Sequence, residues 1–266
     1  MSIFGNENQP MHRLSVVIIT FNEEKKIARC LDSVTEIADE IIVVDSLSSD
    51  STKSICQSYS KVVFIEQPFL GYVNQKEFAL QKASNPYVLC LDADEFLSET
   101  LTHSIKEEKQ KGFPKDGYTM NRLNNYCGQW IRHGDYYPDR KLRLCKKEKV
   151  HWRGDDPHDV LVLAPGAVST HLRGDLCHFS FYTFEEHVTK MNKFSTLAAV
   201  SMFNKGRKKN YFKLIVNPAW AFFNGYILKA GFLDGLAGYT IAKVNAFYTF
   251  MKYLKLIRLH QQKSDE

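Results

Sequence analysis

The chain has 266 residues, of which 44% are apolar, enough to bury a sizeable core in one large domain or in one domain with a helical appendage. Charged residues make up 24%, which is ordinary globular usage and argues against a wholly disordered chain. The net charge of +5 is mild, but residues 200–260 hold ten Lys and Arg against a single acid, Asp234. That imbalance calls for an explanation beyond solubility.

The sequence shows no clear targeting or disulfide signal. Residues 1–12 are polar and contain Pro10, so they are expected to form a loose leader rather than a secretory signal. No run of about 18 uncharged apolar residues is found, which argues against a membrane-spanning helix. The six cysteines are far apart and form no Cys-x-x-Cys pair, which predicts buried, reduced thiols in a cytoplasmic protein rather than a disulfide frame or a zinc site.

From Leu14 to Leu97, short apolar strands alternate with helical stretches. Strands without polar alternation are buried on both faces, as in a parallel sheet covered by helices. The pattern therefore predicts an α/β fold that binds its ligand at the carboxyl ends of the strands. The expected strands are 15–20, 40–44, 62–65 and 87–91, and the expected helices are 24–34, one from about 51, and 73–83.

The pattern changes after residue 117. Short strands, including 141–144 and 151–153, predict an antiparallel extension that carries the acceptor side of the site. From about Tyr182 the chain is helical and aromatic, with breaks expected at Gly206 and at 217–218. We expect a leader at 1–12, a catalytic domain at 13–181 with a nucleotide-binding half (13–97) and an acceptor half (98–181), and a helical region at 182–266.

Polar side chains follow three of the predicted strands. Thr20, Asn22 and Glu23 come at the end of the first strand, Asp45 ends the second, and the carboxylate motif 91–95 ends the fourth. Because the carboxyl ends of parallel strands share one edge of a sheet, these side chains are expected to form one site.

The carboxylate motif places Asp92 and Asp94 two residues apart on a loop that leaves a strand. Such a pair suits a hard cation, and Mg²⁺ or Mn²⁺ bound there would bridge the phosphates of a nucleotide. A solvated acidic turn is the structural alternative.

Three further side chains suit a nucleotide, and each has a structural alternative. Glu23 and Asp45 could accept hydrogen bonds from a base or ribose, or they could serve as a helix N-terminal acid and a turn cap. Lys76 follows Gly71 on a helix and could reach a phosphate or a carbonyl of the base. Alternatively, Lys76 is an ordinary exposed lysine of that helix.

Displacement of a nucleotide by a hydroxyl needs a base. The segment 154–159 offers Asp155, Asp156 and Asp159, and spacing alone does not choose between them. His178 ends another apolar run and is either a metal ligand or a hydrogen-bonded core residue.

Together these motifs resemble the family 2 glycosyltransferases with the GT-A fold. The segments 15–24, 40–46 and 91–95 carry the resemblance, and 138–144 resembles a branch that includes lipopolysaccharide core β-1,4-glucosyltransferases. The resemblance implies a nucleotide pocket lined by Thr20, Asn22, Glu23, Asp45 and Asp92, and a metal at Asp94 with His178. It makes Asp159 the first choice of base, although the branch has Glu there, so Asp155 and Asp156 stay in contention.

The same resemblance implies an inverting, metal-dependent transfer from a UDP-sugar to a hydroxyl of a cell-envelope glycan, namely lipopolysaccharide core or another lipid-linked oligosaccharide. The alternatives are a polyprenyl-phosphate sugar transferase of the same fold and a non-catalytic nucleotide-sugar-binding membrane adaptor. Neither the sugar nor the acceptor can be identified from one sequence.

The basic, aromatic C-terminal region suggests a surface role. One stripe with helical spacing runs through Phe247, Phe250, Met251, Leu254 and Ile257, and lysines flank it. It is either an interfacial helix on an anionic membrane surface, at the inner face of the cell membrane, or a core-packing helix with a solvated basic face. Nucleic acid is not expected as a partner, because no reading module accompanies the charge.

Overall fold

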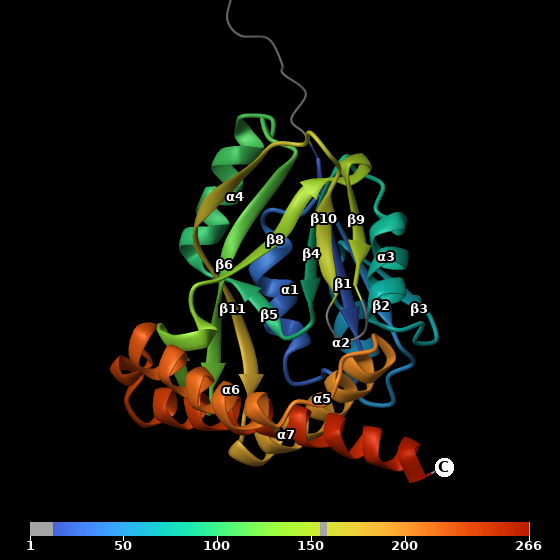
Figure 1. Ribbon diagram of the computed structural model, residues 1–266. Helices are drawn as coiled ribbons and strands as arrows, with labels where there is room; N and C mark the ends of the chain where they lie inside the picture. The colour runs from blue at the N-terminus through green and yellow to red at the C-terminus, as the bar shows by residue number, and fades with distance from the viewer. Residues whose placement is uncertain (1–12, 155–158, 266) are drawn as a thin grey trace, which may run out of the picture. The chain divides into compact units, whose positions relative to one another are not determined.

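The computed structural model describes residues 13–154 and 159–265, and Figure 1 labels their elements. The chain divides into two compact units. The first unit runs to Arg122 and then from Arg140 to His178, and the second comprises 123–139 and the chain from Phe179 onward. The expected functional halves, 13–97 and 98–181, and the region 182–266 stay predictions.

A mixed sheet forms the centre of the first unit. Its parallel part has the order β3 (Val62–Glu66), β2 (Glu40–Asp45), β1 (Leu14–Thr20) and β4 (Tyr87–Asp92), with Thr20 beside Asp45 and Ile19 beside Asp92. Antiparallel β8 follows β4. The order continues through the remaining strands, β8 (Asp139–Lys146), β6 (Gly117–Tyr126), β11 (Ser169–Phe181) and β5 (Glu95–Leu97).

Helices cover both faces of this sheet, because successive residues of each strand point to opposite sides. Val16 and Ile18 pack in one apolar cluster with α1 (Ile27–Thr35), α2 (Thr52–Gln57) and α4 (Glu99–Gln110). Val17 packs in a second cluster with α3 (Tyr72–Lys82) and the hairpin β9–β10. That hairpin consists of β9 (Val150–Arg153), which follows the short helix η2 (Lys147–Lys149), and β10 (Val160–Leu163).

The four strands predicted for 14–97 are confirmed, each within one residue at either end. The first helix starts later than expected, at Ile27 rather than Glu24. The reason is a turn in which the Glu23 carbonyl accepts hydrogen bonds from the backbone N–H groups of Lys26 and Ile27. The α/β class with a mixed sheet is also confirmed.

The second unit is mainly helical, with the ends of β6 and β11 and the short strand β7 (Gln129–Ile131), which pairs with the end of β6. Its small core gathers Tyr126, Ile131 and Ile241. The helical elements are η1 (Gly134–Tyr136), α5 (Phe184–Asn204), α6 (Tyr211–Phe223), the π-helix η3 (Asn224–Leu228), η4 (Gly231–Asp234) and α7 (Gly235–Asp265).

One expected break is confirmed and one is wrong. Gly206 has a φ of 69° between α5 and α6, a conformation that glycine adopts without steric cost. Pro218, in contrast, lies inside α6. A proline removes one helical hydrogen bond, but α6 packs along α7 and the Asn217 amide donates to the Tyr253 hydroxyl at 2.8 Å. Tertiary packing therefore stabilises α6 on both sides of the proline.

The apolar stripe predicted on α7 lies mainly in packing contacts with α5 and α6. Ile257 is buried, Phe250, Met251 and Leu254 are half-buried, and Phe247 is exposed. The Lys255 ammonium donates to side chains of α5, including the Ser195 hydroxyl at 2.8 Å. The structure therefore favours the core-packing interpretation for α7.

The described residues show the lengths of the helices and the state of the cysteines. No helix there is long and apolar enough to cross a membrane. The cysteines are free thiols, and five of them are buried, but Cys127 is exposed, which corrects the expectation that the thiols are buried.

Glu40, at the start of β2, is hydrogen-bonded to β1 and to the segment before β4. Its carboxylate accepts hydrogen bonds from the Ser15 hydroxyl, from Asn85, and from both the backbone and the hydroxyl of Ser84. Burial alone would raise the pKa of Glu40, but these hydrogen bonds outweigh it and lower the pKa below its ordinary value.

We therefore expect Glu40→Gln to reduce the free energy of unfolding at neutral pH by about 1 kcal/mol. A carboxyl whose pKa is lowered by folding stabilises the protein above its unfolded pKa and loses this effect as the pH falls through the folded pKa. Urea unfolding of both proteins should thus show a difference at pH 7 that shrinks below pH 4. A difference that is constant across this range would contradict the assignment.

Candidate active site

Two loops at the carboxyl ends of β1 and β2 are joined by hydrogen bonds. Asn22 has a φ of 53°, a left-handed conformation that asparagine tolerates. Its side-chain oxygen accepts from the Ser49 N–H at 2.8 Å, and its own N–H donates to the Ser48 hydroxyl at 2.8 Å. The Glu23 N–H donates to the Thr52 hydroxyl at 2.9 Å. The two loops therefore form one surface.

Asp45 and Thr20 lie side by side at the base of these loops. The Asp45 carboxylate is buried and accepts a hydrogen bond from the Ser48 N–H at 2.7 Å, so Asp45 caps this turn. The Thr20 hydroxyl is also buried and has no hydrogen-bond partner among the residues that the structure describes. An unsatisfied buried hydroxyl is costly, and a ligand could satisfy it.

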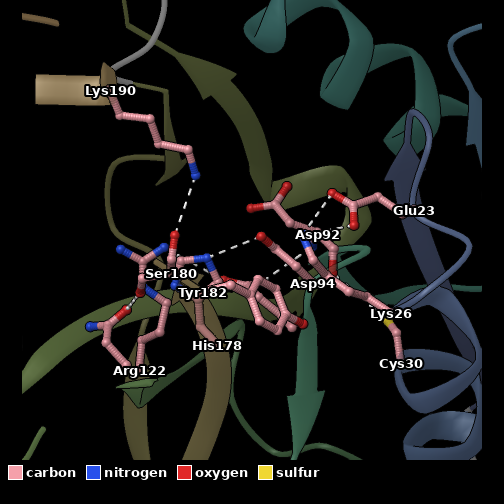
Figure 2. A network of polar contacts seen from close by, with 12 residues as sticks. Glu23, Lys26, Cys30, Asp92, Asp94, Arg122, His178, Ser180, Tyr182 and Lys190 are labelled. Carbon is pink, nitrogen blue, oxygen red and sulfur yellow. Dashed lines mark hydrogen bonds and ion pairs between the residues drawn. The ribbon is translucent and has the colours of Figure 1, made fainter. Parts of the chain in front are cut away.

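Glu23 already has a cation beside it. The Lys26 ammonium lies 2.8 Å from its carboxylate, one turn along the chain. Lys26 is near enough to Asp94 for its charge to help lower the pKa of that carboxyl (Figure 2). The loops after β1 and β4 therefore contribute acidic groups to the same place.

Asp92 is held by two cations. The Lys76 ammonium on α3 lies 2.8 Å from its Oδ1, and the Arg143 guanidinium on β8 donates to its Oδ2 at 3.2 Å. Burial would raise the pKa of Asp92, but these two cations lower it well below its ordinary range. Asp92 is therefore a paired carboxylate with both oxygens engaged.

Lys76 also reaches Asp159, which precedes β10. Its ammonium lies 2.7 Å from Asp159 Oδ2 and 4.9 Å from the centre of the Trp152 ring. Burial lowers the pKa of Lys76, but Asp92 and Asp159 outweigh it and raise the pKa above its ordinary value, so the ammonium stays charged. Residues 76, 92 and 159, all singled out in the sequence, thus meet at one buried cation.

Arg143, Glu95 and Trp152 are members of the site that the sequence did not reveal. Glu95 is fully buried, accepts from Arg143 at 2.8 Å, and fixes the carboxylate loop by accepting from the Asp92 N–H at 3.1 Å. The Arg143 guanidinium lies 5.8 Å from the Trp152 ring centre. Glu95 and Arg143 lie inside the motifs 91–95 and 138–144 that the sequence analysis names, but it assigned neither of them a role.

Asp94 contacts His178, whereas Asp92 contacts Lys76 and Arg143. Asp94 Oδ2 lies 3.4 Å from His178 Nε2, and both side chains are partly exposed, at 21% and 17% (Figure 2). Burial would raise the pKa of Asp94, but the hydrogen bond with His178 lowers it. The two aspartates of the motif therefore differ in environment: one is fixed by cations and the other faces an imidazole.

A divalent metal fits Asp94 and His178 only in part. No group of three protein ligands is found in the described part of the chain. A carboxylate with one imidazole fits a Mg²⁺ or Mn²⁺ ion that completes its shell with substrate phosphates and water, as these ions commonly do. The remaining base candidates, Asp155 and Asp156, lie outside the described residues.

Comparison with known proteins identifies the family of this chain. The model of the glycosyl transferase family 2 domain matches residues 15–159, which include the loops and carboxylates described above. The chain belongs to glycosyl transferase family 2. It is therefore an enzyme that transfers glycosyl groups, and the resemblance expected from its motifs is confirmed.

Two curated relatives match over nearly the whole chain. The lipopolysaccharide core biosynthesis glycosyltransferase LpsC of Rhizobium meliloti is 30% identical over 259 residues, covering 96% of each chain. An uncharacterized glycosyltransferase of Rickettsia prowazekii is 31% identical, covering 92% of this chain and 87% of its own.

A solved structure supports the fold. The mannosyltransferase PcManGT of Pyrobaculum calidifontis, determined with GDP-mannose and Mn²⁺, is 17% identical and matches with a TM-score of 0.56 over 94% of this chain and 88% of its own. At this identity the likeness concerns the fold alone. The GT-A fold expected for this glycosyltransferase is thereby confirmed.

The Lys76 network yields a prediction about stability. Lys76→Met leaves Asp92 and Asp159 without their shared cation, and we expect a loss of roughly 2–3 kcal/mol in the free energy of unfolding. This is below the loss for a fully buried pair because the Asp92 side chain is 26% exposed. The measurement is urea unfolding.

The matched control is Lys111→Met. Lys111 also contacts a carboxylate, Glu108, at 2.8 Å, but it is 58% exposed, so its removal should change stability little. Equal effects of the two substitutions would show that Lys76 is an ordinary surface lysine, contrary to the structure.

Proposed function

We propose that this family 2 glycosyltransferase moves a sugar from a UDP-sugar to a hydroxyl of a cell-envelope glycan, with inversion and with a divalent metal. The observation that supports this proposal is that Asp92 and Asp94 have different contacts. One carboxylate is fixed beside Lys76 and Asp159, and the other faces His178 at the same loop. A donor bound across this loop would have the metal at Asp94 and His178 on one side and the base Asp159 on the other.

The donor pocket would be formed by the loops after β1 and β2. Thr20 has an unsatisfied buried hydroxyl, and Asp45 retains acceptor capacity beside its bonds to Ser48, so both could bind the base or ribose. Asn22 and Glu23 line the same loops, and Asp92 would face the ribose. The mannosyltransferase with the similar fold is bound to GDP-mannose, so UDP and GDP are the two nucleotides to compare.

Asp94 and His178 would hold the metal, and the metal would neutralise charge on the departing diphosphate. Their partial exposure leaves room for phosphate and water oxygens. The similar solved enzyme contains Mn²⁺, which supports the choice of Mg²⁺ or Mn²⁺.

Asp159 is the proposed base. The acceptor oxygen forms a bond to the anomeric carbon, the bond from that carbon to the diphosphate oxygen breaks, and its electron pair leaves with the nucleoside diphosphate. The acceptor proton passes to the Asp159 carboxylate. Lys76 orients the Asp159 carboxylate by its 2.7 Å contact. Because Lys76 also contacts Asp92, the same ammonium positions both carboxylates.

The proposed acceptor is a lipopolysaccharide core or another lipid-linked oligosaccharide at the cytoplasmic face of the membrane. Support comes from the relative LpsC, named for lipopolysaccharide core biosynthesis, which aligns with 96% of this chain.

Nucleotide binding tests the donor proposal. In thermal-shift assays, UDP with Mn²⁺ should raise the melting temperature, while UDP with EDTA should raise it much less. GDP with Mn²⁺ is the competing arm, and stabilisation by GDP alone would replace UDP in the proposal. Stabilisation by no nucleoside diphosphate, in a folded sample, would refute the donor site.

Two substitutions separate metal and base. Asp94→Asn should abolish the metal dependence of nucleotide binding, whereas Asp159→Asn should keep nucleotide binding within about threefold and lower kcat by about 10²-fold or more. Glu148→Gln, an exposed carboxylate that contacts Lys146, is the control and should change neither. Full transfer by the Asp159→Asn protein would assign the base role to Asp155 or Asp156. NMR of the product should show an anomeric configuration opposite to that of the donor.

A further inference from the structure

Helix α6 in the second unit carries an exposed apolar face. None of its residues is buried. Ile215 is 74% exposed and Phe212 is 73% exposed, values typical of lysine or glutamate side chains rather than of large apolar ones. We call this face the α6 stripe, and its members are Phe212, Ile215, Val216, Trp220, Phe223 and Ile227.

The α6 stripe is continuous because its members follow helical spacing. Steps of three and four residues place them on one side of the helix and of the π-helical turn that extends it. The opposite side packs on α7, where the Asn217 amide donates to the Tyr253 hydroxyl. The helix therefore has one half-buried side against α7 and one apolar side toward solvent.

The exposed apolar surface continues past the helix. Leu228, Phe232 and Leu233 are exposed in the turn that follows, and Leu236, at the start of α7, is 80% exposed. Contiguous apolar surface of this kind marks an interaction site in a folded protein.

The sequence segment that carries the α6 stripe has charge of one sign, and of its cations Lys229 is paired with Asp135 at 2.8 Å. Residues 205–233 contain six Lys and Arg and no Asp or Glu. The next acid, Asp234, is buried, and its carboxylate accepts from the His133 N–H at 2.8 Å. Five of the cations lie between the end of α5 and the first turn of α6, namely Lys205, Arg207, Lys208, Lys209 and Lys213.

We propose that the α6 stripe and its flanking cations dock the enzyme on an anionic lipid surface. An apolar face with aromatic side chains enters the headgroup region, and each adjacent cation adds about 1 kcal/mol of attraction to anionic lipids. The docking role would bring the active site to a glycolipid acceptor, and only this purpose rests on the proposed function. The docking helix is α6 rather than α7.

Charge favours lipid over a second copy of the chain as the occupant. In a two-fold contact through the α6 stripe, each chain would bring the same cations to the interface, with no acid from 205 to 233 to pair with them. An anionic membrane supplies the complementary charge. Trp220, which is 58% exposed, suits the boundary between headgroups and acyl chains.

Vesicle flotation of the full chain tests this proposal. Wild-type protein should float with vesicles of phosphatidylethanolamine and phosphatidylglycerol, and float much less with phosphatidylcholine alone. Ile215→Ser with Trp220→Ser, and separately Lys208→Glu with Lys209→Glu, should each lower binding to the anionic vesicles by more than about tenfold. Because these side chains are exposed, the variants should fold, as melting curves would verify.

Matched controls are Val63→Ser with Val168→Ser, two exposed valines of the first unit, and Lys115→Glu, an exposed lysine. These should float like wild type. Unchanged flotation of both α6 variants, or equal flotation of wild type on neutral vesicles, would overturn the proposal. So would a wild-type dimer that binds no vesicles and dissociates on Ile215→Ser with Trp220→Ser, because the stripe would then serve a second copy.

Failure of this proposal can be told apart from failure of the donor proposal. Flotation uses no sugar donor, and the α6 variants should keep the melting shift that UDP and Mn²⁺ give to wild type. Loss of vesicle binding with intact nucleotide binding supports the docking role. Absence of nucleotide binding in wild type would refute the donor site and leave the flotation result standing.

Discussion

The buried ammonium of Lys76 is the interaction on which the arrangement of the site depends. It contacts the carboxylates of Asp92 and Asp159 within 2.8 Å and lies over the Trp152 ring. Three elements distant in sequence, α3, the end of β4 and the segment before β10, are joined by this one charge. A buried cation is stable only when it is paired, so each of these carboxylates is also needed to keep Lys76 in place.

This pairing separates the two aspartates of the motif. With Asp92 engaged by Lys76 and Arg143, the group available for a metal is Asp94, beside His178. The proposed division between a donor side with a metal and an acceptor side with a base follows from that separation. Fixed polar groups need little reorganisation during a reaction, which is an advantage where charge develops on a leaving diphosphate.

The sequence predicted the fold better than it predicted the site. Continuous apolar runs such as 15–20 are buried on both faces, so their strands could be found from the pattern of apolar residues along the chain. Arg143 and Glu95 lie in the segments 138–144 and 91–95, but their roles were missed because a charged side chain on a strand reveals nothing about which face is buried or which partner it meets. Pro218 was misread as a break because local propensity does not include the packing of α6 on α7. The stripe on α7 was periodic, but only the structure shows that α6 carries the exposed face.

The position of the metal tests the central claim most directly. Crystals grown with Mn²⁺ and UDP, measured by anomalous diffraction at the manganese edge, would locate the ion without any assumption about activity. The account predicts a peak in contact with the Asp94 carboxylate and beside His178, with Asp92 still paired to Lys76. A bound nucleotide with the manganese peak on Asp92, or with no peak near Asp94, would contradict it.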